Sequence, residues 1–432
     1  MAPHYPPRSV KHKKLILLTV VLTLLAALVY VNFAGNEKKI KTEIAHLYAV
    51  DDPQFLRSMG LLLGPSIVDG NVATELLNGD AIFPSMLKAI RGARNTVLFE
   101  TYIYWSGKIG DEFADALSER ARNGVKVHVL LDWVGSGKID TAVIDKMKQA
   151  GVQVEKYHPL RWYNLGRLNN RTHRKLLIVD GTVGFTGGVG IAPLWTGNAQ
   201  DPDHWRDSHF RVEGPVVAQM QSVMLDNWAK TTGKVVHGVE YFPPPRPVGS
   251  QRAQVFASSP SGGSESMMMM YLLAITAAER SIDLSSAYFV PDDVTRQALV
   301  DAIRRGVRVR IITPGEHIDA ETVRRASRGL WGPLLEAGAQ MYEYQPTMYH
   351  CKVMIVDGLM TSVGSTNFDV RSFRLNDEAN VNVYDAGFAA RQTQVFEADL
   401  KQSRRVTLQA WQSRPWREKL HEHTLALFGS LL

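Results

Sequence analysis

Two blocks of the chain repeat the same pattern of apolar and polar positions. Residues 95–132 contain NTVLFETYIY, then DEFADALSERARNG, then VKVHVLLD; residues 280–314 contain RSIDLSSAYF, then DVTRQALVDAIRRG, then VRVRIITP. In each block an apolar run typical of a strand precedes a segment with apolar residues at helical spacing. That segment ends at a glycine, Gly124 or Gly306, and a second apolar run follows. The pattern predicts a strand, a helix and a strand in each block.

Both blocks continue in the same way, which indicates an internal repeat. The sequences KMKQAGVQVEKYHP (146–159) and PLLEAGAQMYEYQP (333–346) each predict a further helix and a short strand. Strands that alternate with helices predict an α/β fold, with mixed, largely parallel sheets covered by helices. Between the blocks, the four prolines of YFPPPRPVGSQ are incompatible with a helix or a central strand. We therefore expect a first domain over 60–240, a linker over 241–255 and a second domain over 256–432.

The N-terminal region carries a long uncharged run at residues 15–36. As a helix, its 22 residues would extend about 33 Å, enough to cross a hydrocarbon core of about 30 Å. Four basic residues precede the run and three follow it, which favours a cytoplasmic N-terminus over residues 1–14. The sequence predicts a single-pass anchor in the cell (inner) membrane, with a cleaved signal peptide as the alternative. It leaves open which side of the membrane holds the rest of the chain.

Composition narrows the remaining possibilities. Hydrophobic residues make up 45% of the 432 positions, which is enough for a large core and excludes a disordered chain. The one cysteine, Cys351, excludes an intrachain disulfide and a zinc site built from cysteines. A net charge of +6 suits anionic membranes or phosphate-bearing substrates without proving either.

The most informative residues form a motif that occurs once in each block. The pattern H-x-K-x4-D-G places an apolar tetrapeptide, LLIV or VMIV, between the lysine and the aspartate, and the tetrapeptides read as buried strands. Residues two apart on a strand share a face, so each histidine points the same way as its lysine. Each aspartate falls on the other parity beside a turn glycine, where it is better placed to hold structure. The motif residues are His173, Lys175, Asp180, His350, Lys352 and Asp357.

This set of side chains suits attack on a phosphodiester. A lysine ammonium has no lone pair, so the motif is not a metal site. One neutral imidazole can attack phosphorus while the other, protonated, donates to the leaving oxygen. The two ammonium groups stabilise charge on the equatorial oxygens, the role that a metal ion has elsewhere. We predict neither a metal nor a cofactor.

The paired motifs resemble the phospholipase D superfamily. The second motif continues as GSTN (364–367) and FDVRSFRLNDEAN (368–380), which is similar to bacterial cardiolipin synthases. The resemblance implies two phospholipase D-like α/β/α halves related by a pseudo-twofold axis, with both motifs at one site and a phosphohistidine intermediate. It also implies that Ser365 and Asn367 support the phosphate and that Glu378 orients a histidine. In this family the N-terminal histidine is commonly the nucleophile, which favours His173.

The first motif departs from the family pattern. It continues as Gly187-Gly188-Val189-Gly190, so the serine and asparagine positions are glycines. Backbone N–H groups at Gly187 and Gly188 are then the expected phosphate contacts of this half. Asp207 lies where the second half has Glu378, and the two acids are candidate partners for the two histidine rings. A solvated loop acid is the alternative for Asp207.

The aromatic and basic run 160–171 has no counterpart in the second half and predicts an additional loop beside the site.

These observations lead to a functional prediction with alternatives. The resemblance favours a phosphatidyltransferase that converts two phosphatidylglycerols to cardiolipin and glycerol. A phospholipase D hydrolase that releases phosphatidic acid would use the same site, and so would a phosphodiesterase or nuclease, although we see no long basic stripe and expect no nucleic acid. All six motif positions are intact, which argues against a non-catalytic scaffold. The expected partners are anionic phospholipids, phosphatidylglycerol and cardiolipin, at a membrane. The acceptor, acyl preference and oligomeric state stay open.

Overall fold

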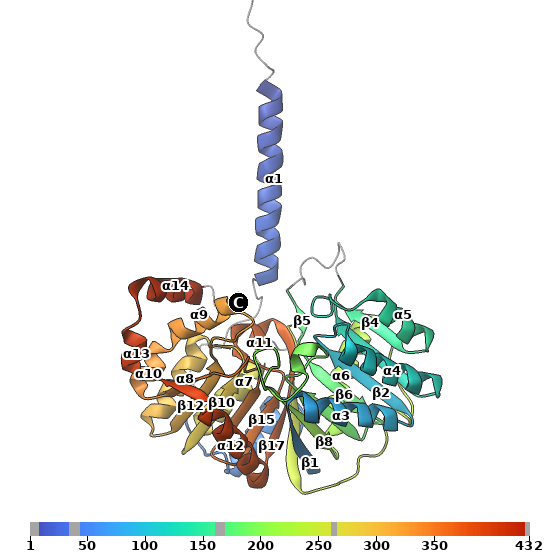
Figure 1. Cartoon of the computed structure of the whole chain (residues 1–432). Helices are drawn as coiled ribbons and strands as arrows, with labels where there is room; N and C mark the ends of the chain where they lie inside the picture. The colour runs from blue at the N-terminus through green and yellow to red at the C-terminus, as the bar shows by residue number, and fades with distance from the viewer. Residues whose placement is uncertain (1–7, 34–43, 160–168, 261–265, 428–432) are drawn as a thin grey trace, which may run out of the picture.

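The computed structural model describes residues 8–33, 44–159, 169–260 and 266–427. The body consists of two halves with the same order of elements, packed side by side (Figure 1). The elements of the N-terminal half are β1 (Val68–Leu77), α3 (Asn78–Gly92), β2 (Thr96–Thr101), α4 (Lys108–Arg122), β3 (Lys126–Asp132), α5 (Thr141–Gln149), β4 (Gln153–Tyr157), β5 (Arg171–Thr172), β6 (Lys175–Val179), β7 (Val183–Gly187), the short 3₁₀ helix η2 (Pro193–Trp195), β8 (Ser208–Glu213) and α6 (Val217–Thr232).

The C-terminal half repeats the main elements of this order, inserts β11, β16 and α11 among them, and adds β18, α13 and α14 at its end. Its elements are β9 (Gln251–Ser258), α7 (Ser266–Ala277), β10 (Ser281–Ser286), β11 (Phe289–Val290), α8 (Asp293–Arg304), β12 (Arg308–Pro314), α9 (Glu321–Leu330), α10 (Gly332–Ala337), β13 (Gln340–Tyr344), β14 (Lys352–Val356), β15 (Met360–Gly364), β16 (Phe368–Asp369), α11 (Val370–Arg374), β17 (Asn376–Tyr384), α12 (Ala386–Lys401), β18 (Ser403–Val406), α13 (Leu408–Gln412) and α14 (Trp416–Leu427).

All described strands except β11 and β16, which pair with each other, form one continuous sheet whose order reveals the internal symmetry. Outward from the centre, one half runs β1-β8-β7-β6-β2-β3-β4 and the other runs β9-β17-β15-β14-β10-β12-β13, with β18 added at the edge. Equivalent strands therefore occupy equivalent places, and the antiparallel pair β1–β9 joins the halves. Because β9 begins at Gln251, the predicted linker over 241–255 includes the start of a central strand. The division into two domains stays a prediction.

The α/β class and the mixed sheet are confirmed, but the expectation of a largely parallel sheet is wrong. Along the path of described strands, parallel pairing is confined to β2-β3-β4 and β10-β12-β13. Their neighbours toward the centre pair antiparallel. The physical reason is the length of the connections: three residues join β6 to β7, and three join β14 to β15. A parallel crossover requires a dozen or more residues.

Three apolar clusters hold the sheet and helices together. One lies under α3, α4 and α5 of the N-terminal half, and another lies under α7, α8 and α10 of the C-terminal half. The third, on the side of α6 and α12, contains strand residues of both halves, such as Leu98 and Val381. The two halves therefore share part of their interior, which fixes the motifs of one half relative to those of the other.

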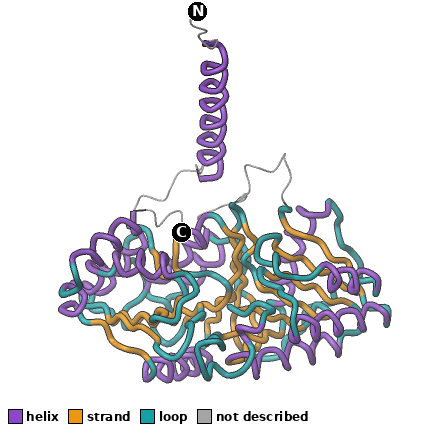
Figure 2. Tube along the Cα trace, turned by 45° about the horizontal axis from the view of Figure 1, so that its top comes forward, coloured by secondary structure: helices purple, strands orange, loops and turns teal. Residues whose placement is uncertain are grey.

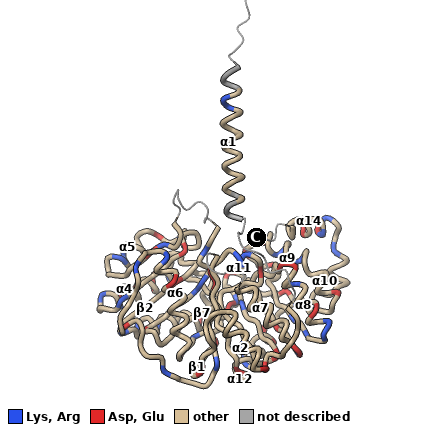
Figure 3. The backbone as a smooth tube through the Cα atoms, turned by 180° about the vertical axis from the view of Figure 1, so that it is seen from behind, with Lys and Arg blue, Asp and Glu red and all other residues tan. Residues whose placement is uncertain are grey.

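Helix α1 (Arg8–Phe33) projects from this body as a single rod (Figures 1 and 2). It contains no acidic residue, as Figure 3 also shows for its described part. Among the described residues, no helix combines the length and apolar content that a bilayer crossing requires. The predicted anchor over residues 15–36 is therefore not confirmed. Residues 34–36, residues 1–7 of the predicted N-terminal segment and most of the 160–171 loop lie outside the described residues.

Candidate active site

The two histidine motifs begin at strands that lie on either side of the central junction. His173 lies between β5 and β6, and its backbone N–H donates to the carbonyl of Asp377 at 2.9 Å. His350 precedes β14, and its backbone N–H donates to the carbonyl of Arg206 at 2.8 Å. In addition, β5 pairs with β17 of the other half. The main chain of each motif is thus tied to the opposite half of the molecule.

The side chains continue this exchange between the halves. His173 Nδ1 lies 2.9 Å from Oε1 of Glu378, which belongs to the C-terminal half. His350 Nδ1 lies 2.7 Å from Oδ2 of Asp207, which belongs to the N-terminal half. The sequence indicated Glu378 and Asp207 as partners of the two histidine rings. In the structure each acid contacts the histidine of the opposite half. Each imidazole is held by the carboxylate of the other half.

These contacts fix the tautomer of both rings. An ionised carboxylate only accepts hydrogen bonds, so Nδ1–H of each imidazole is the donor and Nε2 keeps its lone pair. Lys352 Nζ also lies 3.1 Å from His350 Nδ1, but an Nδ1 that donates to Asp207 cannot accept from the ammonium. The ammonium instead donates to the carbonyl of its own histidine, at 2.6 Å, and Lys175 does the same at 2.7 Å.

The electrostatics leave both rings neutral in the substrate-free site. Burial lowers the pKa of His173 to about 4 and that of His350 to about 3. Each lysine lowers the pKa of both imidazoles, so the two motifs act on each other within one site. Burial likewise lowers the pKa of Lys175 to about 7 and lowers the pKa of Lys352.

The two carboxylates remain ionised although they are buried. Burial raises the pKa of Glu378, but His173 and Lys175 outweigh burial and hold that pKa below its usual range. Burial also raises the pKa of Asp207, and His350 and Lys352 outweigh it in the same way. Two buried carboxylates and two buried ammonium groups thus keep the charge of the site balanced.

The two carboxylates are supported by different donors. Ser365 Oγ donates to Glu378 Oε2 at 2.5 Å. The indole Nε1–H of Trp195 donates to Asp207 Oδ2 at 3.0 Å, and the backbone N–H of Ser208 donates to Oδ1 at 2.8 Å. Trp195 was missed by sequence reasoning, because its place in the irregular stretch after β7 has no counterpart in the second motif. A buried indole needs an acceptor, and this one finds the carboxylate.

The structure gives the backbone N–H of Gly188 a partner within the protein. The backbone N–H of Gly188 donates to the carbonyl of Ser208 at 3.2 Å and is therefore not directed at a phosphate. A Cβ at Gly188 would lie 2.3 Å from Asp207 Oδ1, and a Cβ at Gly187 would lie 2.6 Å from the Cα of His209. These positions are glycine because the Asp207 carboxylate and strand β8 occupy the space that a side chain needs.

The serine and asparagine of the second motif take separate roles. Ser365 acts through Glu378, since its hydroxyl donates to that carboxylate rather than being free for a phosphate. Asn367 is buried, and its side-chain oxygen has no hydrogen-bond partner among the described residues. At the matching Gly190, a Cβ would lie 2.8 Å from Ile103 and 3.1 Å from the ring of Trp195. The carboxamide of Asn367 therefore has no counterpart in the first motif, where Gly190 stands.

The motif aspartates lie where strand parity predicts, at the strand ends and away from the rings. Asp180 accepts from the backbone N–H groups of residues 94–96, at 2.7–2.9 Å. Asp357 accepts from those of residues 279–281, at 2.8–2.9 Å. Both have positive φ, 51° and 53°. Each aspartate thus fixes the chain entering the strand that pairs with its own motif strand.

Aromatic side chains form part of the walls around the two imidazoles. Tyr102 meets His173 edge to face, with ring centroids 5.2 Å apart. Trp195 and Trp205 both lie 5.4 Å from the ring of His350. These rings contribute to the burial that keeps the imidazoles neutral.

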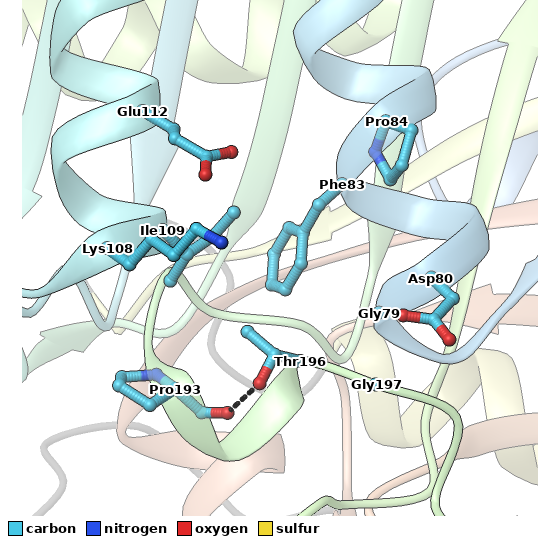
Figure 4. Close-up of a pocket in the computed structure, with 10 residues that line it drawn as sticks. All are labelled: Gly79, Asp80, Phe83, Pro84, Lys108, Ile109, Glu112, Pro193, Thr196 and Gly197. Atoms are coloured by element: carbon cyan, nitrogen blue, oxygen red, sulfur yellow. Dashed lines mark hydrogen bonds between the residues drawn. The ribbon is translucent and has the colours of Figure 1, made fainter.

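A separate cavity of about 450 Å³ borders the segment that carries Trp195. Figure 4 shows it between helices α3 and α4 and the chain around η2, with Phe83, Ile109 and Pro193 among its apolar lining residues. Neither motif histidine lines it. It is therefore distinct from the site at the two imidazoles.

Two histidine–lysine motifs that meet across a pseudo-twofold junction, each held by the other half, define a phospholipase D-like enzyme. The family described as the phospholipase D-like domain of cardiolipin synthase matches residues 86–201 and 271–400. A cardiolipin synthase of Geobacillus kaustophilus is 35% identical over 360 residues, covering 83% of this chain and 72% of the relative. A probable cardiolipin synthase of Bacillus subtilis, YwiE, is 36% identical, with coverage of 83% and 71%.

A solved structure supports the same fold. The crystal structure of phosphatidylserine synthase from Haemophilus influenzae superposes with a TM-score of 0.63 at 12% identity, covering 88% of this chain and all of that one. The chain belongs to the cardiolipin synthase family of the phospholipase D superfamily, and it is a phosphatidyltransferase.

Proposed function

We propose that this enzyme transfers a phosphatidyl group from one phosphatidylglycerol to a hydroxyl of a second, forming cardiolipin and releasing glycerol. The observation that carries the proposal is the crosswise pairing of His173 with Glu378 and of His350 with Asp207. It provides two imidazoles of defined tautomer and two ammonium groups in one buried site. The relatives named above, which are cardiolipin synthases, support this substrate class.

In the first step, Nε2 of His173 attacks the phosphorus of the donor lipid. The bond between phosphorus and the headgroup glycerol oxygen breaks, and Nε2–H of protonated His350 donates to that oxygen. His350 is neutral before substrate binds, because burial lowers its pKa to about 3. The phosphodiester anion raises this pKa as it binds, since a negative charge beside the ring favours the imidazolium. We assign the attack to His173 because the family commonly uses its N-terminal histidine.

In the second step, a hydroxyl of the acceptor lipid replaces the histidine. His350 Nε2 takes the hydroxyl proton, the oxygen bonds to phosphorus, and the bond between phosphorus and His173 Nε2 breaks. Lys175 and Lys352 stabilise the charge on the equatorial oxygens in both steps. On the side chain of Asn367, the NH₂ is the group that can donate to one of these oxygens. One P–O bond is broken and one is formed, so the exchange balances.

Water competes with the acceptor for the phosphohistidine. Transfer prevails only if the acceptor hydroxyl is held in line, which can be worth an effective molarity of about 10⁵ M or more. We propose that residues 15–36 hold the enzyme at the cell membrane, where acceptor lipids are concentrated, with a cytoplasmic N-terminus. Supporting this, Leu15 and Leu24 of α1 are exposed. Removal of residues 1–36 should reduce transfer on vesicles more than cleavage of a soluble phosphodiester.

The purified full chain in phosphatidylglycerol vesicles tests the proposed function. We expect equal amounts of cardiolipin and glycerol by lipid mass spectrometry and enzymatic glycerol assay, with little phosphatidic acid. The double variant H173A/H350A is the control for contaminating activity. Phosphatidic acid as the main product, with no cardiolipin at any lipid density, would instead identify a hydrolase.

A further inference from the structure

Helix α14 presents an apolar face to the outside of the molecule. The side chains of Trp416, Leu420 and Leu427 are 68%, 59% and 82% exposed. They are four and seven residues apart, so they form one stripe along the helix. Large apolar side chains that share one exposed stripe, rather than being scattered singly, mark an interaction surface.

The opposite face of the same helix is charged, and Glu422 on it is buried. Glu422 is 1% exposed and forms ion pairs with Arg414 and with Arg328, the latter at 3.1 Å. Glu418 lies 3.1 Å from the same Arg328. A surface helix of a globular protein ordinarily buries its apolar stripe and exposes its charges. Helix α14 is arranged in the reverse way.

This orientation is fixed by close packing against α9. A Cβ at Gly329 of α9 would lie 2.8 Å from the carbonyl oxygen of Glu422, so the glycine allows the two helices to approach closely. Arg325 of α9 also contacts His421 Nδ1 at 2.7 Å. Because the charged face is held by these contacts, α14 cannot roll to bury its apolar stripe without breaking buried ion pairs.

The position of α14 and its neighbouring charges indicate which partner its apolar stripe contacts. Figures 1 and 3 show α14 on the side of the body from which α1 projects. Figure 1 also places β5 and α11 toward that side, and these elements flank the His173 motif and the Asn367 segment in the sequence. Arg417 and Lys419 lie on either side of the stripe, and the Arg417 guanidinium is 5.5 Å from the Trp416 ring centre. Tryptophan and leucine flanked by basic residues are typical of helices that lie in a membrane interface.

We propose that α14 is an interfacial helix that inserts its Trp416–Leu420–Leu427 stripe into the headgroup region of an anionic bilayer. It orients the two-histidine site toward the lipid surface. A second copy of the chain is a poorer occupant, because three side chains are too few for a stable dimer of about 1,200 Å² or more. Self-pairing would also bring like charges together. The proposal relies on the proposed function only for the choice of phosphatidylglycerol as the lipid.

A single label on the full chain tests this proposal without an activity measurement. Cys351 is 1% exposed, and burial raises the pKa of its thiol to about 12, so it reacts poorly with thiol reagents. A nitroxide on L420C is therefore selective. We expect phosphatidylglycerol vesicles to raise its collision rate with oxygen and to lower that with a nickel chelate, each about threefold or more.

The matched control is the same label on L61C. Leu61 is 81% exposed on α2 (Pro53–Leu62), which Figure 3 shows on the body well away from α14. We expect this label to stay in water. The proposal is overturned if the label at 420 remains water-accessible on vesicles, if both labels respond alike, or if the label at 420 becomes shielded with rising protein concentration and no lipid.

A second variant connects the helix to catalysis. W416Q/L420Q/L427Q removes the apolar stripe but leaves the contacts of Glu422 and Arg328. We expect unchanged turnover of a soluble phosphodiester and about tenfold lower transfer on vesicles. Equal transfer by the variant and the native chain on vesicles would overturn the orienting role. Absence of turnover in both proteins would instead contradict the proposed function, leaving the label experiment intact.

Discussion

The two carboxylate–imidazole pairs of the site both hold a histidine through its Nδ1, but they use different side chains to do so. On one side, the long acid Glu378 reaches His173 and is supported by the hydroxyl of Ser365. On the other side, the shorter acid Asp207 reaches His350 and is supported by the indole of Trp195. The distances between Nδ1 and carboxylate oxygen are similar, 2.9 and 2.7 Å. The halves therefore conserve the contact and not the residues that make it.

The comparison explains why the first motif lacks a serine. The Asp207 carboxylate lies 2.3 Å from the place of a Cβ at Gly188, whereas Glu378 leaves room for the side chain of Ser365. The space of the missing hydroxyl is filled by the carboxylate itself, and its hydrogen bond is replaced by Trp195. The glycines of the first motif therefore belong to a working arrangement in which Asp207 and Trp195 replace the serine contact, and they do not indicate loss of function.

The largest expected effect distinguishes the two histidines. H173A and H350A should each lower kcat about 10³-fold or more, because neither ring can both attack phosphorus and protonate the leaving group. With phosphatidyl-p-nitrophenol, whose leaving group needs no acid, H350A should accumulate a protein-bound phosphatidyl group detectable by intact-protein mass spectrometry. H173A should not. The covalent mass on H173A instead would assign the nucleophile to His350.

Neutralising the carboxylates should cost less and should separate the two roles. E378Q and D207N each replace one acceptor oxygen by an NH₂ donor, which disfavours the required tautomer and should lower kcat on the order of 10²-fold. In the first step, measured as the burst of released p-nitrophenol, the D207N loss should shrink, because this leaving group needs no proton from His350. The E378Q loss should persist. Equal responses of both variants to the leaving group would contradict the crosswise assignment.

The pH dependence should reveal the cation of the first motif. Burial lowers the pKa of Lys175 to about 7, and a lysine is charged only below its pKa. We use a soluble phosphodiester with a p-nitrophenyl leaving group, which needs no proton from His350, so that kcat/KM depends on Lys175 and not on the acid. For the substrate-free enzyme, kcat/KM on this substrate should fall above about pH 7, approaching tenfold per pH unit. In K175R the side chain keeps its charge, so the pH at which kcat/KM begins to fall should be higher, even if the maximal rate of the variant is lower. If kcat/KM of K175R falls at the same pH as that of the native enzyme, Lys175 is not the group that causes the fall.

Alanine at the two matched positions should have unequal effects. G188A places a Cβ against Asp207 and should displace that carboxylate from His350, giving a loss of activity that approaches that of D207N. S365A only removes a donor to Glu378, worth about 1 kcal/mol, and should lower kcat about fivefold. W195F, which removes the donor to Asp207, should resemble S365A. Similar losses for G188A and S365A would refute the volume argument.

The smallest effect on activity is expected where the halves are alike. D180N and D357N each weaken three hydrogen bonds to backbone N–H groups and should lower the free energy of unfolding by about 1–3 kcal/mol. Activity per folded molecule should stay near that of the native enzyme. Urea unfolding and active-site titration measure the two quantities. A fully folded D180N that has lost its turnover would place this aspartate in the chemistry.

Much of the architecture follows from local patterns. The repeated strand–helix–strand blocks appear as β2-α4-β3 and β10-α8-β12, and Gly124 and Gly306 have positive φ values of 85° and 99° where their helices end. Strand parity also places Asp180 and Asp357 away from the imidazoles. These features depend on neighbouring residues, whose spacing the sequence states directly. The antiparallel direction of the central strands was not predicted, because the alternation of strands with helices describes only the outer parallel strands and not the short hairpins β6–β7 and β14–β15.

The sequence by itself determined the two motifs, their paired lysines and the two acids that accompany the rings. Only the tertiary structure decided which acid holds which ring, because the pairing of β5 with β17 and the shared interior of the halves bring together residues 205 and 143 positions apart. The same is true of Trp195, whose role depends on the space at Gly188 and Gly190, and of α14, whose buried face is set by α9. Contacts of this kind arise from packing in three dimensions, for which one sequence carries no local signal.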